Sequence, residues 1–392
     1  MSLLPVAEAQ ARLLALHAPL PAETAALHDA AGRWAATDVR ARRTQPAADL
    51  SMMDGYAIRF ADLPGPWRVI GESRAGAGIA ASVAPGEAAR IFTGAPLPPG
   101  ADAIVVQEEA RRDGDRLWLD GEGPPRIGAS IRQRGSDFHD GDLLAAAGGN
   151  WTPARIALAA IGGHGALPVR RRPRVTLIST GDELVAPGTP AEGVLLPASN
   201  APMLRAMIGG LAEVTDAGLV PDRLDALVAA FRASDADVIV TTGGASVGDH
   251  DLVRPALEQA GAALDFWRIA MRPGKPLLAG TLDGTVVLGL PGNPVSAFVT
   301  ARLFLLPLLA HLSGARDPLP RAERAALASP LPAVGGRDDY VRAVFTGDGI
   351  APVGVEDSAV LSALARADML IVRRAGSSPA AVGEVVDIIR IA

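Results

Sequence analysis

The chain has 392 residues, a net charge of −6, 49% hydrophobic residues and no cysteine. At roughly 100 to 200 residues per domain, this length predicts two to four domains. The absence of cysteine excludes disulfides, a thiolate nucleophile, Cys-ligated zinc and iron–sulfur clusters held by this chain. The six histidines are scattered without a metal-binding spacing, so we expect any metal to be held by oxygen ligands.

Charge and hydropathy patterning argue against two classes of partner. The chain has no basic run of the kind that nucleic-acid binders carry. Apolar runs such as Leu303–Ala310 end within a dozen residues, short of the roughly eighteen that span a bilayer. Glu8 and Arg12 interrupt the N-terminal apolar stretch, which does not fit a signal peptide. We expect a soluble, cytoplasmic protein with no nucleic-acid or membrane partner.

The first half of the chain predicts a helical domain with a β domain inserted into it. Residues 1–44 are rich in Ala with apolar residues at helical spacing, and Thr152-Pro153 is typical of a helix start. We therefore assign residues 1–44 and 140–172 to the helical domain. Residues 45–139 form short alternating segments between Gly and Pro turns. The strands predicted there are Trp67–Gly71, Ala88–Phe92, Ala103–Gln107 and Arg116–Leu119.

The second half predicts a doubly wound α/β domain over residues 173–314 and a C-terminal β-barrel-like domain over residues 315–392, which makes the fold class multidomain α/β and β. Alternating strands and helices indicate a mostly parallel sheet, with ligands bound beyond the carboxyl ends of its strands. The α/β strands predicted are Val175–Ser179, Glu213–Leu219, Val238–Thr242, Leu264–Ile269 and Val286–Leu290, and the helices are Ala201–Ile208, Leu224–Ala233, Leu252–Ala260 and Val295–Leu312. The C-terminal strands predicted are Tyr340–Phe345, Met369–Val372 and Val385–Ile391.

Two loops at the predicted edge of the α/β sheet combine hydroxyls, glycines and carboxylates. The first runs from Ser179 and Thr180 to Asp182 and Glu183, although these carboxylates could also simply cap the next helix. The second, residues 241–251, offers glycine amides for a phosphate and carboxylates for a hard cation such as Mg²⁺. A tight turn would use the same glycines. Its candidate ligand residues are Gly243, Gly244, Ser246 and Asp251.

Two further loops supply donors and a cation. Lys275 is the only Lys among 37 basic residues, and its loop, Met271–Pro276, has prolines that restrict the backbone. Chance survival of one surface Lys is the alternative. Residues 289–296, with Asn293 and Ser296, form a strand-to-helix junction whose free amides could face an oxyanion. Together the four loops suit an anionic substrate with a Mg²⁺-bridged phosphate.

Three segments outside the α/β domain are weaker candidates. They are residues 51–57 around Asp54, residues 93–96 beginning at Thr93, and residues 132–137 ending at Asp137. Each carboxylate could equally belong to an ordinary turn.

The ordered series of motifs resembles the molybdopterin molybdenumtransferase family, the MoeA type that includes the gephyrin E domain. Single motifs of this kind are common, but the series is specific and covers essentially the whole chain. The motifs are SMMDGYA at 51–57, TGAPLPPGADAIVVQE at 93–108, RQRGSD at 132–137, STGDEL at 179–184, TTGGASVGDHD at 241–251, RPGKP at 272–276 and GLPGNPVSA at 289–297.

The resemblance implies that adenylyl-molybdopterin and molybdate yield molybdenum cofactor and AMP, assisted by Mg²⁺. It implies a homodimer with the active cleft between the α/β domain of one subunit and the inserted domain of the other, and transient contact with the molybdopterin adenylyltransferase. The pterin would supply the sulfur ligands that a chain without cysteine lacks.

The resemblance also implies roles for individual residues. Asp54 and Thr93 would face the partner's cleft, and Asp137 follows a family pattern. Glu183 and Asp251, with Asp222 as a third ligand, would hold Mg²⁺. Ligand contacts would come from Ser179, Thr180, Gly243, Gly244, Ser246, Lys275, Pro276, Asn293, Ser296, Arg342, Ala343 and Ser362.

Two departures and two alternatives accompany this interpretation. Arg272 stands where the family often has Lys, and Met52 where it often has Ala. A molybdopterin adenylyltransferase is the first alternative, because its fold resembles the α/β domain. A gephyrin-like scaffold is the second, but the sequence shows no long linker or extra binding module.

Overall fold

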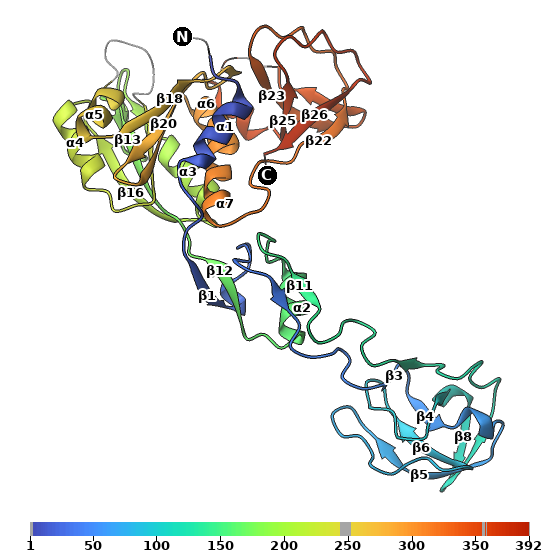
Figure 1. Cartoon of the computed structure of the whole chain (residues 1–392). Helices are drawn as coiled ribbons and strands as arrows, with labels where there is room; N and C mark the ends of the chain where they lie inside the picture. The colour runs from blue at the N-terminus through green and yellow to red at the C-terminus, as the bar shows by residue number, and fades with distance from the viewer. Residues whose placement is uncertain (1–2, 244–251, 355–356, 358, 392) are drawn as a thin grey trace.

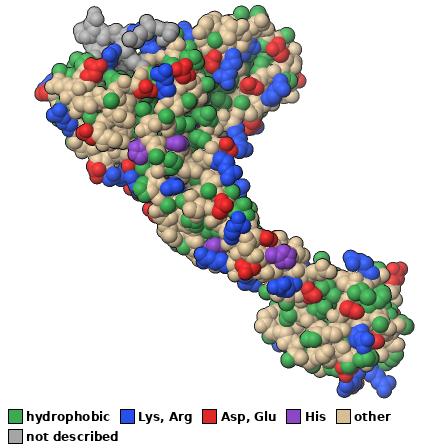
Figure 2. Space-filling model, in the orientation of Figure 1, with side chains coloured by type: hydrophobic (Ala, Val, Ile, Leu, Met, Phe, Trp, Pro, Cys, Tyr) green, Lys and Arg blue, Asp and Glu red, His purple; other side chains and the backbone are tan. Residues whose placement is uncertain are grey.

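The computed structural model describes residues 3–243, 252–354, 357 and 359–391 as an elongated molecule (Figure 1). An α/β domain and a C-terminal β domain lie together at one end. A six-stranded sheet from the first third of the chain lies at the other end, and a narrow middle part joins the two. On the face seen in Figure 2, acidic and basic side chains are interspersed along this whole length.

The α/β domain has one six-stranded sheet with four parallel strands and two antiparallel ones. Its strands in spatial order are β16 (Glu213–Val220), β13 (Arg174–Thr180), β17 (Val238–Thr242), β21 (Thr285–Leu290), β20 (Pro276–Leu282) and β18 (Ala263–Arg268). The five predicted strands are confirmed. β20 was not predicted, and Pro276 was assigned to the preceding loop; burial and pairing to β21 and β18 make the segment a strand.

Helices cover both faces of this sheet. Successive strand residues face opposite sides, so Val238 and Val240 belong to one apolar core and Ile239 to the other. The first core contains α1 (Val6–Ala15), α3 (Asn200–Ile208), α6 (Pro294–Thr300) and α7 (Leu306–Leu312), and the second contains α4 (Leu224–Arg232) and α5 (Val253–Ala260). The four predicted helices are confirmed, with a π-helical turn, η4 (Ala301–Leu305), between α6 and α7.

This last helical run, Pro294–Leu312, agrees with the predicted Val295–Leu312 to within one residue. Among the described residues, Pro294–Leu312 is a helix long and apolar enough to cross a membrane, but 83% of its apolar window is buried inside the protein. Its side chains, including Phe304 and Leu308, pack in the first core of the α/β domain. The run therefore serves as a core helix of this domain.

The middle part is not the helical domain that the sequence predicted. Its strands are β1 (Ala22–Ala26) paired with β12 (Ala166–Arg170) and β2 (Val39–Arg40) paired with β11 (Leu143–Ala145), and its helices are α2 (Pro153–Ile161) and the short 3₁₀ turn η1 (Leu27–Asp29). The helix prediction for these residues was wrong because pairing with a distant strand outweighs the helix propensity of an Ala-rich segment. The predicted start of α2 is confirmed, since the Thr152 hydroxyl accepts a hydrogen bond from the Arg155 amide.

Helix α1 belongs to the α/β domain and not to the middle part. Val6, Ala9 and Leu13 lie in the first core, and the buried Gln10 side chain donates to the Leu303 carbonyl oxygen at 2.8 Å. The N-terminal segment thus packs against the π-helical turn of a helix almost 300 residues away.

The distal β domain contains the four strands predicted for it and two more. Its sheet has the order β7 (Ala103–Val106), β4 (Gly55–Ile58), β6 (Glu87–Ile91), β5 (Trp67–Ser73), β9 (Arg116–Leu119) and β8 (Ala110–Asp113), with 3₁₀ turns η2 (Phe60–Asp62) and η3 (Gln107–Glu109). The short strands β3 (Leu50–Ser51) and β10 (Ile131–Arg132) pair beside it.

The C-terminal domain is a sheet that recruits one strand from the α/β segment. The strand order is β19 (Met271–Arg272), β23 (Asp338–Thr346), β25 (Met369–Arg373), β26 (Val385–Arg390) and β22 (Glu323–Ala326), and β24 (Gly349–Pro352) pairs with β23. The domain also contains helix α8 (Leu361–Ala365). A separate two-stranded pair, β14 (Leu184–Val185) with β15 (Leu196–Pro197), belongs to the α/β domain. The three predicted strands are confirmed. Tyr340, Leu370 and Ile389 belong to the same core as α6, so the two domains share one apolar interior.

We predict that Leu13→Ala destabilises the α/β domain by about 2–5 kcal/mol, because it leaves a cavity at a side chain that is 1% exposed. Urea unfolding followed by far-UV circular dichroism measures the change. Arg12→Ala is the control, since its ion pair with Glu8 is half exposed and contributes under about 1 kcal/mol. Equal effects of the two substitutions would contradict the assignment of α1 to this core.

Candidate functional site

The carboxyl ends of the α/β strands bring the predicted loops to one edge of the sheet. In the parallel register Ser179 lies opposite Thr242, and Thr242 lies opposite Leu290. The residues that follow these strands are therefore neighbours at this edge. Asn293 accepts a hydrogen bond from the Val295 amide at 3.2 Å and caps α6, which places Ser296 in its first turn.

Glycine is required where the second loop leaves β17. Gly243 has a φ of +93°, and a Cβ there would lie 2.1 Å from the Thr180 carbonyl oxygen. A larger residue would push the first and second loops apart. The predicted residues Gly244, Ser246 and Asp251 lie outside the described residues.

Carboxylates from two strand ends meet at the same edge. The Thr180 hydroxyl donates to the Asp222 carboxylate, and the Asp222 amide donates to Asp182 Oδ1 at 3.1 Å. The exposed Glu183 carboxylate folds back over Gly181. Each carboxylate keeps oxygen lone pairs for a hard cation. Within the described ranges, however, no three His, Asp or Glu side chains are close enough to hold a metal on their own.

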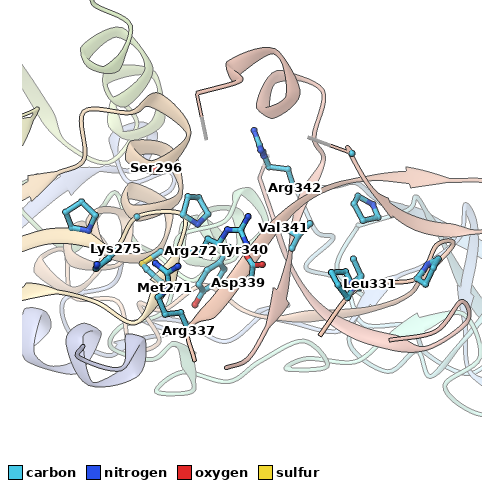
Figure 3. A pocket seen from close by; sticks show the side chains of 17 residues that line it. Met271, Arg272, Lys275, Ser296, Leu331, Arg337, Asp339, Tyr340, Val341 and Arg342 are labelled. Atoms are coloured by element: carbon cyan, nitrogen blue, oxygen red, sulfur yellow. The ribbon is translucent and has the colours of Figure 1, made fainter. Parts of the chain in front are cut away.

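A cavity of about 410 Å³ lies where the Met271–Pro276 loop meets the C-terminal sheet (Figure 3). The structure brings four predicted site residues to it: Lys275, Pro276, Ser296 and Arg342. The other lining residues are Met271, Arg272, Pro273, Gly274, Pro330, Leu331, Pro332, Arg337, Asp339, Tyr340, Val341, Pro352 and Gly354. The cavity is thus built from both domains.

The charged side chains of the cavity favour an anion. Four cations, Arg272, Lys275, Arg337 and Arg342, line it with a single carboxylate, Asp339. This excess of positive charge in a partly enclosed space attracts an anion more strongly than the same charges would in open water.

Strand pairing fixes the loop that carries Lys275. In β19, Met271 and Arg272 pair with Asp338 and Asp339 of β23, and the Ile269 amide donates to the Lys275 carbonyl oxygen at 3.0 Å. Gly274 has a φ of +102°, and a Cβ there would lie 2.5 Å from Thr300 Cγ2. The backbone is therefore held closely while the Lys275 side chain remains exposed.

Arg342 is held from behind by carbonyl groups. Its side chain is 7% exposed, and its two terminal nitrogens donate to the carbonyl oxygens of Val360 and Asp357, each at 3.0 Å. Burial lowers the pKa of Arg342, yet a guanidinium stays charged at neutral pH. The charge is thus oriented before any ligand arrives.

Two ligand contacts predicted in the C-terminal domain, Ala343 and Ser362, do not line the cavity. Ala343 follows Arg342 in β23, and its side chain is fully buried in the core of the C-terminal sheet. Ser362 lies exposed on α8 and is not among the lining residues. Strand alternation explains the first case, because neighbouring side chains point to opposite faces.

Arg337 was missed by the sequence prediction. It lies at the end of a Gly335-Gly336 turn, five residues before Arg342. One signal could have indicated Arg337: it is a cation directly before β23, and the edge of β23 meets the Lys275 loop. That pairing between β19 and β23 was not visible in the sequence.

Asp54 and Thr93 form a separate site in the distal β domain. Asp54 Oδ1 accepts hydrogen bonds from the Thr93 amide at 2.7 Å and from the Thr93 hydroxyl at 2.9 Å. These bonds, the amide first, hold the pKa of Asp54 below its ordinary value. Asp137 is exposed in the segment that leaves this domain. The distal β domain that carries Asp54 and Thr93 lies at the opposite end of the chain from the two domains that form the cavity (Figure 1).

Three protein-family models match consecutive parts of the chain. The MoeA N-terminal region (domains I and II) matches residues 4–163, the probable molybdopterin binding domain matches residues 176–311, and the MoeA C-terminal region (domain IV) matches residues 324–391. The molybdopterin molybdenumtransferase of Haemophilus influenzae is 35% identical over 383 residues, which cover 94% of each chain. The chain belongs to the molybdopterin molybdenumtransferase (MoeA) family.

Other MoeA relatives agree with this assignment. The molybdopterin molybdenumtransferase of Staphylococcus aureus is 32% identical over 400 residues, covering 98% of this chain and 95% of that protein. The crystal structure of a MoeA protein from Pyrococcus horikoshii aligns over all of both chains with a TM-score of 0.83 at 27% identity. The family recognised from the motifs is therefore confirmed, and the MoeA architecture extends over the whole chain.

We predict that Thr93→Val raises the pKa of Asp54 partway toward its ordinary value, because one of two hydrogen bonds to the carboxylate is lost. Carboxyl-carbon NMR titration measures this. Thr93→Ser keeps the hydroxyl and should leave the pKa low. An unchanged pKa in Thr93→Val would show that the hydroxyl does not act on Asp54.

Proposed function

We propose that this chain inserts molybdenum into molybdopterin, with molybdate as the source of the metal. The observation that carries the proposal is the cavity in which four cations and the Ser296 residue surround space for a small anion. Molybdate is a tetrahedral dianion, so a concentration of fixed positive charge suits it. Membership of the family and the names of its relatives support the same reaction.

The layout of the sheet edge suits one extended ligand. β13 and β20 are separated by two strands, so the Glu183 loop and the Lys275 loop lie about 14 Å apart at strand spacing. We propose that the nucleotide end of adenylyl-molybdopterin lies over the glycine and carboxylate loops. Its pterin end would then reach the cationic cavity. The close contact of Gly243 with the Thr180 carbonyl supports a backbone that a phosphate can approach.

We also propose that the reaction releases AMP and depends on Mg²⁺. Glu183 and Asp222, together with Asp251 beyond the described residues, would hold the ion along with oxygens of the ligand. The oxygen-only donors and their position at the exposed edge fit such an ion. When bound, Mg²⁺ would neutralise charge on the pyrophosphate.

The chain's own residues would act mainly by positioning. Lys275 and Arg342 would hold molybdate beside the pterin sulfurs, and the buried Arg342 brings its charge already oriented by two carbonyl oxygens. Bringing two anions together is costly in water, and fixed cations lower that cost. No covalent nucleophile is needed.

We further propose that two copies of the chain form a homodimer in which Asp54 and Thr93 complete the partner's site. These residues lie far from the cavity of their own chain, and the adjacent Met52 and Met53 side chains are 47% and 43% exposed. Exposed apolar side chains beside a hydrogen-bonded carboxylate are typical of a contact surface.

A transient contact with the molybdopterin adenylyltransferase would deliver the adenylylated pterin.

The reaction is tested by incubating the protein with adenylyl-molybdopterin, Mg²⁺ and molybdate, and by measuring AMP release and reconstitution of an apo-molybdoenzyme. Free molybdopterin with ATP is the second arm. Transfer of AMP onto the pterin in that arm would favour the alternative of an adenylyltransferase.

We predict that Lys275→Ala lowers kcat/KM for molybdate at least about tenfold, because a charged hydrogen-bond donor to the anion is lost. The reconstitution assay at low molybdate concentration measures the loss. Arg232→Ala, on the exposed surface of α4, is the matched control and should leave activity unchanged. Full activity of Lys275→Ala at low molybdate would contradict the proposed role.

A further inference from the structure

We propose that Arg337 is a further molybdate-binding residue. It belongs to the C-terminal domain, and its guanidinium would donate hydrogen bonds to the anion in the cavity. The inference rests on the proposed function, because it assigns the anion in the cavity as molybdate. It adds to the site a residue that the motifs around Lys275 and Arg342 did not indicate.

The four cations of the cavity differ in how their charges are used. Arg342 donates to two carbonyl oxygens, and Arg272 also interacts with other groups of the protein. The side chains of Lys275 and Arg337 form no hydrogen bond or ion pair with any described residue. These two side chains are therefore the ones whose donors remain available for a ligand.

The backbone on both sides of Arg337 is fixed. The Gly376 amide donates to the Gly335 carbonyl oxygen at 2.8 Å, and the Asp338 amide donates to the Ala270 carbonyl oxygen at 2.9 Å. The second bond ties the residue after Arg337 to the α/β domain beside β19. Arg337 thus extends from an anchored turn, half-buried, into the cavity (Figure 3).

The neighbouring acid is already occupied. The Asp338 carboxylate accepts hydrogen bonds from Arg374 Nη1 at 2.8 Å and from the Ala375 amide at 2.9 Å. Asp338 therefore pairs with Arg374 and not with Arg337, and Asp339 is the carboxylate that shares the cavity lining with Arg337. This arrangement separates the two arginines by function, one holding the turn and one facing the ligand space.

The chemistry of the two available cations is complementary. A guanidinium presents two parallel N–H groups to two oxygens of a tetrahedral oxyanion, whereas an ammonium acts as a point charge. Because Lys275 belongs to the α/β domain and Arg337 to the C-terminal domain, an anion held by both links the domains. The same chemistry would serve a phosphate group, so the test must distinguish the two anions.

Isothermal titration calorimetry of the full chain with sodium molybdate tests the inference. We expect Arg337→Gln to raise the Kd for molybdate about tenfold or more, and Arg337→Lys to raise it less. Arg324→Gln, an exposed Arg of β22 in the same domain, is the matched control and should bind like wild type. In turnover, Arg337→Gln should raise KM for molybdate more than it lowers kcat.

The outcomes separate this inference from the proposed function. Equal molybdate affinity of Arg337→Gln and Arg324→Gln would overturn the inference alone. A loss seen only with inorganic phosphate as the titrant would also overturn it. No binding of molybdate by the wild-type chain would overturn the proposed function as well. If Arg337→Gln failed to fold, Arg337→Lys with wild-type affinity for molybdate and an unchanged KM would still count against the bidentate role.

Discussion

The short backbone pairing between β19 and β23 is the interaction on which the cavity depends. It adds Met271 and Arg272, from the α/β segment, to the edge of the C-terminal sheet. Two ladder positions contribute little free energy by themselves, but the domains also share one apolar core that contains Tyr340 and Leu370. That core makes the pairing rigid, and the rigid pairing sets where Lys275 stands relative to Arg342.

The same junction concentrates positive charge, because four cations and one carboxylate, Asp339, line the cavity. Fixed backbone on both sides of the cavity holds the segments that carry these cations, and carbonyl oxygens orient Arg342. Carbonyls stabilise a guanidinium without cancelling its charge. The cavity thus keeps an electrostatic attraction for anions that surface ion pairs such as Arg254–Glu258 do not offer.

Elongation gives the molecule two separate chemical regions. The cavity and the carboxylate edge lie at one end, and Asp54 with Thr93 lies at the other, beyond a narrow middle part (Figure 1). The middle part is built from two short strand pairs and α2, with Trp151 buried among its few apolar residues. A small packed unit of this kind holds the two ends apart, so Asp54 and Thr93 do not contribute to the cavity of their own chain.

The sequence by itself determined five of the six strands of the α/β sheet and the four helices between Asn200 and Leu312, since their apolar periodicity reflects burial on one or both faces. Its ordered motifs also determined the family. Only the tertiary structure decided that α1 packs on the α/β core, that residues 22–26 form a strand, that Ala343 turns away from the cavity and that Arg337 enters it. Each of these depends on contacts between residues distant in the chain, and local pattern and propensity carry no information about such contacts.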